Sequence, residues 1–265
     1  MRHARPRATT GGKLEAPESK IVPIGDAATE PLVAVIIPAL NEAGKICRVL
    51  DKMPRDGRFE AIVVDDGSTD ATGAEAREHG AAVVLRHEQR RGVGAAIRSG
   101  FECGVERGRP WLALISGDDQ HEPGELVSAL ELALSTNADY VQGSRWMAGG
   151  CVIGPIGNRG PGQRIYSLVF SMLAFRRISD ATNGFRLFRS SILSDPSIRL
   201  GQDWLDSYDL EPYLLYKTIR CGYRLVQHPV TVRYHGAEGF TKMRGLRDWW
   251  RLFRPALLLR LGAKS

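Results

Sequence analysis

The residues with the clearest capacity for chemistry lie in the stretch LALISGDDQHEP, at 112–123. Apolar residues run up to Ile115, as in a short strand covered on both faces. Asp118 and Asp119 follow within a Ser-Gly turn. Two carboxylates at the end of a buried strand are costly to desolvate without a compensating positive charge. Mg²⁺ or Mn²⁺ provides that charge and shares its ligands with substrate phosphates, so the stretch predicts a metal–phosphate site. The alternative is a surface turn whose Asp pair caps a helix.

Hydrophobic patterning predicts the elements that position this stretch. Apolar runs bounded by turn residues indicate strands at 33–40, 61–64, 81–86 and 111–116. Helices are expected between them. They open at Asn41 and Glu42 (with Ile46, Val49 and Leu50 on one face), at 71–79, after the turn RRGVG at 90–94, and at 125–134. Such alternation is typical of a parallel sheet with helices on both faces.

Polar residues follow each of the four expected strands, at the edge of the sheet where ligands bind in this class of fold. They are Asn41, Glu42, Asp65, Asp66, Arg90, Arg91 and residues 118–120. The acidic members of this set suit a bound metal, and the basic members suit the phosphates of a nucleoside diphosphate. The turn RRGVG is predicted to cradle a phosphate with backbone N–H groups. The alternative is that Gly92 and Gly94 only permit close packing, since the turn matches no standard nucleotide-binding motif.

The second half of the chain is less regular. A strand at 140–146 ends near Arg145, and the Gly- and Pro-rich residues 149–162 predict a loop beside the site. The segment 180–188 is expected to form a turn and a strand, EPYLLYKTIRCGY a helix, and RLVQHPVTVRY edge strands interrupted by Pro229. An apolar stripe at helical spacing is predicted to face the core; its members are Ile165, Leu168, Val169, Met172 and Leu173.

The C-terminal segment, 245–265, is amphipathic. Pro255 is expected to kink it or to start a second helix. Two placements are open: an interfacial helix on anionic lipid, or a helix docked on the domain or in a homodimer. Its apolar face comprises Leu246, Trp249, Trp250, Phe253, Leu257 and Leu261, with Arg247, Arg251 and Arg254 beside it.

Composition favours an anionic partner. The net charge of +6 and a pI near 9.3 suit a nucleotide, a phosphorylated acceptor or a membrane surface. Nucleic acid is disfavoured, because no recognition-helix pattern is present. The four cysteines form no CxxC pair, which indicates neither a zinc site nor disulfides and favours a cytoplasmic protein. No apolar run approaches the length of a membrane span, and residues 1–31 resemble a disordered tail.

Seven segments in this order and spacing, from residue 32 to 244, resemble family 2 glycosyltransferases. They are VAVIIPALNE, AIVVDDGSTDAT, RRGVGAAIRSGF, ISGDDQHEP, VQGSRW, DATNGFRLF and GFTK. The nearest branch is the polyprenyl-phosphate sugar transferases, such as dolichyl-phosphate mannose synthases. The resemblance implies a GT-A fold, with a Rossmann-like, mostly parallel α/β sheet, a Mg²⁺ or Mn²⁺ cofactor and a GDP- or UDP-linked sugar donor. It also implies possible peripheral contact with the inner face of a membrane.

The resemblance also implies roles for individual residues. Asp118 and Gln120 would bind the metal. Arg145, Asn183, Arg186, His235 and Lys242 would face the sugar or the acceptor. The nucleotide would contact Pro38, Ala39, Asn41, Glu42, Asp65, Asp66, Arg91, Gly92, Ser116 and Gly117.

The chain departs from the family pattern at two positions. Ser116 stands where the first acidic residue of the DxD motif is expected, which weakens the case for a metal. Gly236, beside His235, stands where an Arg six residues before Lys242 commonly binds the acceptor phosphate.

Three functions follow. The leading one is an inverting, metal-dependent transfer to a polyprenyl phosphate, which is already ionised and needs no general base. The second is transfer to a soluble hydroxyl, which needs a carboxylate to accept its proton. The third is a non-catalytic anion- or membrane-binding module. The candidate bases are Asp206, Asp209 and Glu211, with Glu211 placed most like the family's acid and helix capping as the alternative role.

Overall fold

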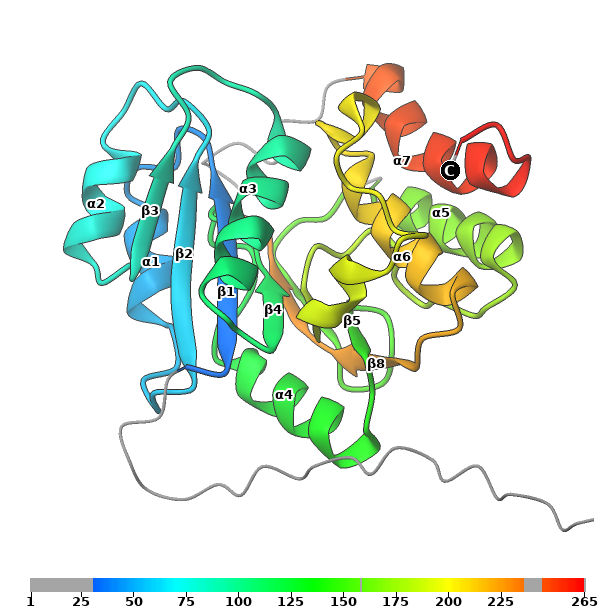
Figure 1. Cartoon of the computed structure of the whole chain (residues 1–265), viewed down its shortest axis with the longest axis horizontal. Helices are drawn as coiled ribbons and strands as arrows, with labels where there is room; N and C mark the ends of the chain where they lie inside the picture. Colours follow the sequence, from blue (N-terminus) through cyan, green and yellow to red (C-terminus); the bar gives the residue numbers. More distant parts are fainter. Residues whose placement is uncertain (1–30, 158, 236–244, 265) are drawn as a thin grey trace, which may run out of the picture.

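A computed structural model describes residues 31–157, 159–235 and 245–264 of the chain (Figure 1). Most of the expected N-terminal tail therefore lies outside the described residues, as do Gly236 and Lys242. Within the described ranges, no helix is long and apolar enough to cross a membrane.

In the part of the chain that the structure describes, seven strands form one sheet in the order β3-β2-β1-β4-β7-β5-β8. Every pairing in it is parallel except those of β7, which runs antiparallel to β4 and β5. The strands β6 and β9 pair separately. The strands are β1 (Val33–Ala39), β2 (Phe59–Asp65), β3 (Val83–Arg86), β4 (Trp111–Leu114), β5 (Tyr140–Ser144), β6 (Cys151–Ile153), β7 (Arg186–Arg189), β8 (Leu225–Pro229) and β9 (Thr231–Arg233).

Helices cover both faces of the sheet, as predicted. Successive side chains of a strand point to opposite faces, so in β1 Ile36 packs toward α3, α5, α6 and α7, whereas Val35 packs toward α1, α2 and α4. The helices are α1 (Ile46–Asp51), α2 (Thr72–Glu78), α3 (Val93–Glu106), α4 (Glu125–Thr136), α5 (Arg159–Ala174), α6 (Leu210–Arg220) and α7 (Gly245–Arg260).

The loop after β1 differs from the prediction, because α1 begins at Ile46 and not at Asn41. Asn41 has a left-handed backbone, with φ of 52°, and the chain turns before it becomes helical. Side chains of the segment after β2 accept the N–H groups of this turn. The hydrogen bonds are Asn41 N to Ser68 Oγ, Glu42 N to Thr72 Oγ1, Ala43 N to Asp70 Oδ2 and Gly44 N to Glu75 Oε2.

The α5 region corrects two predictions. The expected loop at 149–162 contains the short strand β6, and α5 already begins at Arg159. The predicted core stripe is also wrong for Ile165, Leu168 and Met172, which are exposed, while Tyr166 and Phe170 face the core. Because α5 is apolar almost all round, its sequence did not show which face points inward.

The helix α7 lies beside α5 and α6 (Figure 1). It runs as one helix through Pro255, so the expected second helix does not form. Leu252, Phe253 and Ala256 pack against the core, and Tyr166 Oη donates a hydrogen bond to Leu252 O at 2.9 Å. Of the two placements left open, the described part of α7 adopts the docked one.

Candidate active site

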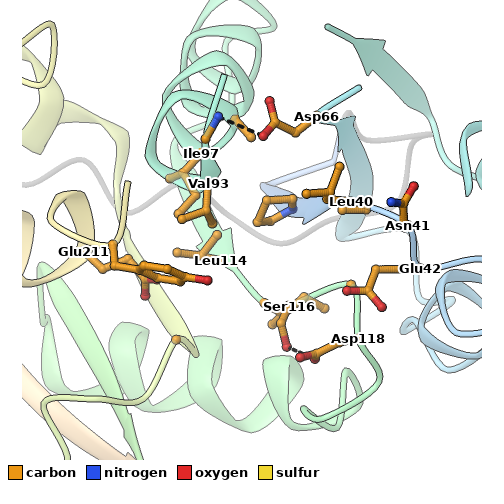
Figure 2. A pocket seen from close by; sticks show the side chains of 18 of the residues that line it. Leu40, Asn41, Glu42, Asp66, Val93, Ile97, Leu114, Ser116, Asp118 and Glu211 are labelled. Carbon is orange, nitrogen blue, oxygen red and sulfur yellow. Dashed lines mark hydrogen bonds between the residues drawn. The ribbon is translucent and has the colours of Figure 1, made fainter. Parts of the chain in front are cut away.

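A pocket of about 440 Å³ opens beyond the carboxyl ends of β1 and β4, between α3 and α6. Figure 2 shows Glu211 on the opposite side of it from Asn41 and Glu42. Ten of the predicted site residues line this pocket: Pro38, Ala39, Asn41, Glu42, Asp66, Gly92, Ser116, Gly117, Asp118 and Glu211.

Asp118 presents its carboxylate at the pocket within the loop that follows β4 (Figure 2). Its Oδ1 accepts hydrogen bonds from Ser116 Oγ at 2.6 Å and from Gln120 N at 3.2 Å. Gln120 Nε2 donates to Oδ2 at 2.8 Å. Ser116, the unexpected residue of the motif, therefore orients Asp118, and Gln120 supports Asp118 without lining the pocket.

Asp119 has the opposite environment, being only 3% exposed. Its carboxylate forms ion pairs with Arg48 at 2.9 Å and Lys52 at 2.7 Å. Burial alone would raise the pKa of Asp119, but hydrogen bonds from Lys52 and Arg48 hold it below its ordinary value. His235 Nε2 also donates to Asp119 O at 2.9 Å. The negative charge of Asp119 is thus neutralised by protein groups, and Asp118 is the member of the pair that lines the pocket.

His121 connects this loop to the interior. Ser116 N donates to His121 Nδ1 at 3.1 Å, so the proton of the ring lies on Nε2, which pairs with Asn183 Oδ1 at 3.1 Å. Burial, aided by the charge of Arg145, lowers the pKa of His121 to about 4 and keeps the ring neutral. Asn183 is fully buried and also accepts a hydrogen bond from Phe185 N. Asn183 therefore supports the loop through its hydrogen bond to His121 and does not line the pocket.

The turn RRGVG does not present the predicted phosphate cradle. Arg91 N and Gly92 N donate to the two oxygens of Asp66, at 2.8 and 2.9 Å, and Gly94 N donates to Asp206 O at 3.0 Å. A Cβ atom on Gly92 would lie 2.2 Å from Asp206 O, and one on Gly94 would lie 1.9 Å from Leu205 O. Both glycines therefore permit close packing, as in the alternative interpretation, and Gly92 also lines the pocket.

The acidic pair after β2 shapes the pocket from one side. Asp66 lines it, yet both of its carboxylate oxygens hold the RRGVG turn, and Oδ1 also pairs with His87 Nδ1 at 2.8 Å. Asp65 is fully buried and accepts hydrogen bonds from Ser68 N and Arg86 Nη1. Asp65 does not line the pocket, which leaves it a structural role here.

Two of the predicted acceptor residues, Arg145 and Arg186, are buried and do not line the pocket. Arg145 is buried and forms an ion pair with Asp180 at 2.6 Å. Arg186 is 1% exposed and forms an ion pair with Glu211, whose carboxylate lines the pocket. Arg186 Nε also donates to Gln142 Oε1 at 3.2 Å. Among these residues, Glu211 is the one that reaches the pocket, with Arg186 directly behind it.

Asp209, a candidate base, lies outside the pocket lining. It is buried at the N-terminus of α6 and forms an ion pair with Arg254 of α7. Burial raises the pKa of Asp209 despite that partner. Asp206 is likewise absent from the lining and forms an ion pair with Arg98 at 2.6 Å. Of the three candidate bases, Glu211 alone has access to a ligand in the pocket.

A divalent cation fits the pocket through Asp118. Mg²⁺ usually takes one or two carboxylates and completes its ligand shell with water and substrate phosphates. The described residues contain no cluster of three His, Cys, Asp or Glu side chains that could hold a metal unaided. A metal bound here would draw on Asp118 and on the phosphates of the ligand.

Several lining residues were not predicted from the sequence. Most are apolar and lie at strand ends or on the first turns of α3, where nothing in their type signals a pocket. Lys45 adds positive charge to that of Arg90, which was expected at this edge of the sheet, and the segment before α6 adds one wall. The unpredicted lining residues are Leu40, Lys45, Val93, Ala96, Ile97, Leu114, Ile115, Gly184, Ser207 and Tyr208.

Comparison with known proteins gives the family. The model for glycosyl transferase family 2 matches residues 34–195. Undecaprenyl-phosphate mannosyltransferase of Micrococcus luteus is 32% identical over 205 residues, 75% of this chain and 82% of that protein. Polyprenol monophosphomannose synthase of Mycolicibacterium smegmatis is 31% identical over 228 residues, 84% of each chain. This chain belongs to glycosyltransferase family 2.

Solved structures give the same fold. Glucosyl-3-phosphoglycerate synthase from Mycobacterium tuberculosis, crystallised with Mn²⁺, uridine diphosphate and glucosyl-3-phosphoglycerate, matches with a TM-score of 0.64 and 23% identity. The match covers 89% of this chain and 81% of that one. The predicted α/β fold of the GT-A type is confirmed. The protein is a nucleotide-sugar-dependent glycosyltransferase, which sets aside the non-catalytic module.

Proposed function

We propose that this protein is an inverting, metal-dependent glycosyltransferase that moves a sugar from a nucleoside-diphosphate sugar to a polyprenyl phosphate. The observation that carries the proposal is the pocket beyond β1 and β4, with Asp118 on one wall and the Glu211–Arg186 pair on another. The acceptor class is supported by two relatives, whose names specify undecaprenyl phosphate and polyprenol monophosphomannose.

The donor would lie between the end of β1 and the start of α3. Val93 and Ile97 offer apolar surface to a base, while Arg90 offers positive charge to phosphates and Lys45 offsets the charge of Glu42 at 3.1 Å. Breaking the bond between the sugar and the diphosphate builds negative charge on the leaving group, which Arg90 would help to stabilise. A cation bound at Asp118 supplies Lewis-acid stabilisation of the same charge.

The acceptor would approach the sugar from the side opposite the leaving group, so the product would have the inverted anomeric configuration. A phosphate acceptor is ionised near neutral pH and needs no general base. Glu211 carries a negative charge that would repel it, and Arg186 offsets that charge from behind the wall. We assign Arg186 the role of making this wall compatible with an anionic acceptor.

Glu211 favours one second candidate, transfer to a hydroxyl acceptor. A hydroxyl must lose its proton as it attacks, and a positioned carboxylate typically contributes about 10²–10⁴-fold to such a step. The two candidates respond differently to Glu211→Gln. For a phosphate acceptor, the variant should retain kcat within about tenfold, whereas for a hydroxyl acceptor it should lose that whole contribution.

The proposal is tested with a panel of UDP- and GDP-linked sugars, with Mg²⁺ or Mn²⁺, and with or without a short polyprenyl phosphate. We expect sugar transfer to the lipid phosphate, inversion at the anomeric carbon by NMR, and loss of transfer in EDTA. Transfer to a water-soluble alcohol with none to the lipid phosphate would establish the second candidate instead.

A further inference from the structure

One face of α5 is apolar and open to solvent. Its side chains recur at intervals of three and four residues, which places them on one side of the helix. We call this set the outer stripe; it comprises Ile165, Leu168 and Met172 of α5 and Phe175 directly after it, with exposed fractions of 60, 62, 59 and 68%. Contiguous apolar surface of this kind on a soluble fold marks an interaction site.

Positive charge surrounds the outer stripe. Residues 159–178 contain four arginines and no aspartate or glutamate, and Arg164, Arg176 and Arg177 are exposed. The end of α7 adds Arg260, whose guanidinium lies 4.5 Å from the centre of the Phe175 ring. Figure 1 shows α5 and α7 side by side on the same part of the molecule.

We propose that the outer stripe and its arginines form a docking surface for an anionic lipid bilayer. An apolar helix face flanked by arginines inserts its side chains at the headgroup boundary while the arginines pair with lipid phosphates. A second copy of this chain fits less well. Two stripes packed antiparallel about a two-fold axis would bring Arg164 of one copy against Arg176 and Arg177 of the other.

The position of the outer stripe suits the proposed acceptor. The biological purpose of this docking rests on the proposed function, whereas the binding test does not. The inner face of α5 packs against α6, the helix that begins beside Glu211. A protein resting on α5 would hold the acceptor side of the pocket near the bilayer, where the phosphate of a polyprenyl lipid lies. The predicted lipid contact thereby moves from the apolar face of α7 to α5.

The test is co-sedimentation of the full chain with vesicles of phosphatidylcholine alone or mixed with phosphatidylglycerol. The variant is Leu168→Gln with Met172→Gln, and the matched control is Val105→Gln with Leu134→Gln, two exposed apolar residues on other helices. We expect the stripe variant to weaken binding to the mixed vesicles at least about tenfold, because two inserted side chains are lost. The control should bind like the wild type.

The same vesicle assay also tests the contribution of positive charge. Arg177→Gln and high salt should each weaken binding to the mixed vesicles and leave the low binding to phosphatidylcholine unchanged. Unchanged vesicle binding by the stripe variant would overturn the proposal. A stripe variant that turns a dimer into a monomer in sedimentation velocity, with vesicle binding retained, would identify a subunit interface instead. Failure of the proposed function, seen as no transfer to any polyprenyl phosphate, would leave these binding results standing.

Discussion

Asp118 and Asp119 are adjacent in sequence but have different partners. Asp119 is neutralised by Arg48 and Lys52, which come from α1 and the residue after it. Asp118 is held by its own loop and faces the pocket. The sequence predicted an acidic pair at a strand end. It did not reveal the ion pairs of Asp119, because Arg48 and Lys52 lie about seventy positions earlier in the chain.

Asp118→Ala should lower kcat by about two to three orders of magnitude, because one charge-stabilising contact to the leaving group is removed. The midpoint of thermal unfolding should change little, since the side chain lies at a pocket and not in the core. Steady-state kinetics and a thermal melt check both expectations. Near-normal turnover would remove Asp118 from the metal site.

Asp66→Ala should destabilise the fold and weaken donor binding together. The carboxylate accepts the N–H groups of Arg91 and Gly92 beside the pocket, and leaving these part-buried donors unpaired costs at most about 1–3 kcal/mol each. We expect a lower free energy of unfolding in urea and a higher KM for the donor, with a smaller effect on kcat. Unchanged values of both would show that the turn holds its shape without Asp66.

His121 should make stability depend on pH. Burial lowers the pKa of His121 from 6.5 to about 4. Between these two pH values, His121 is therefore protonated in the unfolded chain and neutral in the folded chain. Stability from this residue is present above about pH 6.5 and is lost as the pH falls toward 4. Between pH 7 and pH 5, the free energy of unfolding should fall by about 2 kcal/mol more in the wild type than in His121→Gln. Urea titrations at the two pH values measure this difference, and equal slopes would contradict the assignment.

At the scale of elements, α7 holds one wall of the pocket. Arg251 Nη1 donates to Ser207 Oγ at 2.8 Å, and Arg254 pairs with Asp209 and donates to Trp204 O. Ser207 also lines the pocket. Arg251 and Arg254, two of the arginines that the sequence suggested for lipid contact, therefore position the segment before α6.

Arg254→Ala should destabilise the protein by about 3–5 kcal/mol, because it leaves the buried carboxylate of Asp209 without its cation. Nucleotide affinity should fall as well, since the loosened segment carries Ser207. Urea unfolding and calorimetric titration with the free nucleotide measure the two effects. Arg260→Ala, which changes an exposed arginine of the same helix, is the control for the loss of a positive charge. Adding Asp209→Asn to Arg254→Ala should restore part of the stability.

Secondary-structure elements were predicted correctly where the type of a residue indicates whether it is buried, and incorrectly where it does not. The strands β1, β2 and β4 were predicted because continuous apolar runs suit a sheet buried on both faces. The turn at Asn41 was missed, because its backbone depends on acceptors at Ser68, Thr72 and Glu75. The orientation of α5 was missed, and the placement of α7 was left open, because each carries apolar residues on more than one face.

At the scale of the whole molecule, removing residues 245–265 should lower the unfolding midpoint by at least about 10 °C, because the deletion combines an unpaired Asp209 with lost core contacts of α7. Donor binding and lipid transfer should both fail. A chain that stops after Arg260 retains these contacts and is the matched control. Selective loss of lipid transfer in the longer deletion, with stability and donor binding intact, would show that α7 serves the membrane alone.

The antiparallel strand β7 also sets the order in which the chain can fold as it leaves the ribosome. Strands β1 to β4 can pair once Leu114 has emerged, whereas β5 must wait for β7, residues 186–189, to fill the place between it and β4. During that interval, one edge of β4 lacks its partner, and unpaired strand edges promote association between nascent chains. The segment from β1 to β4, which contributes most of the pocket lining, would therefore form early in translation, and the segment from β5 to β8 would complete the sheet later.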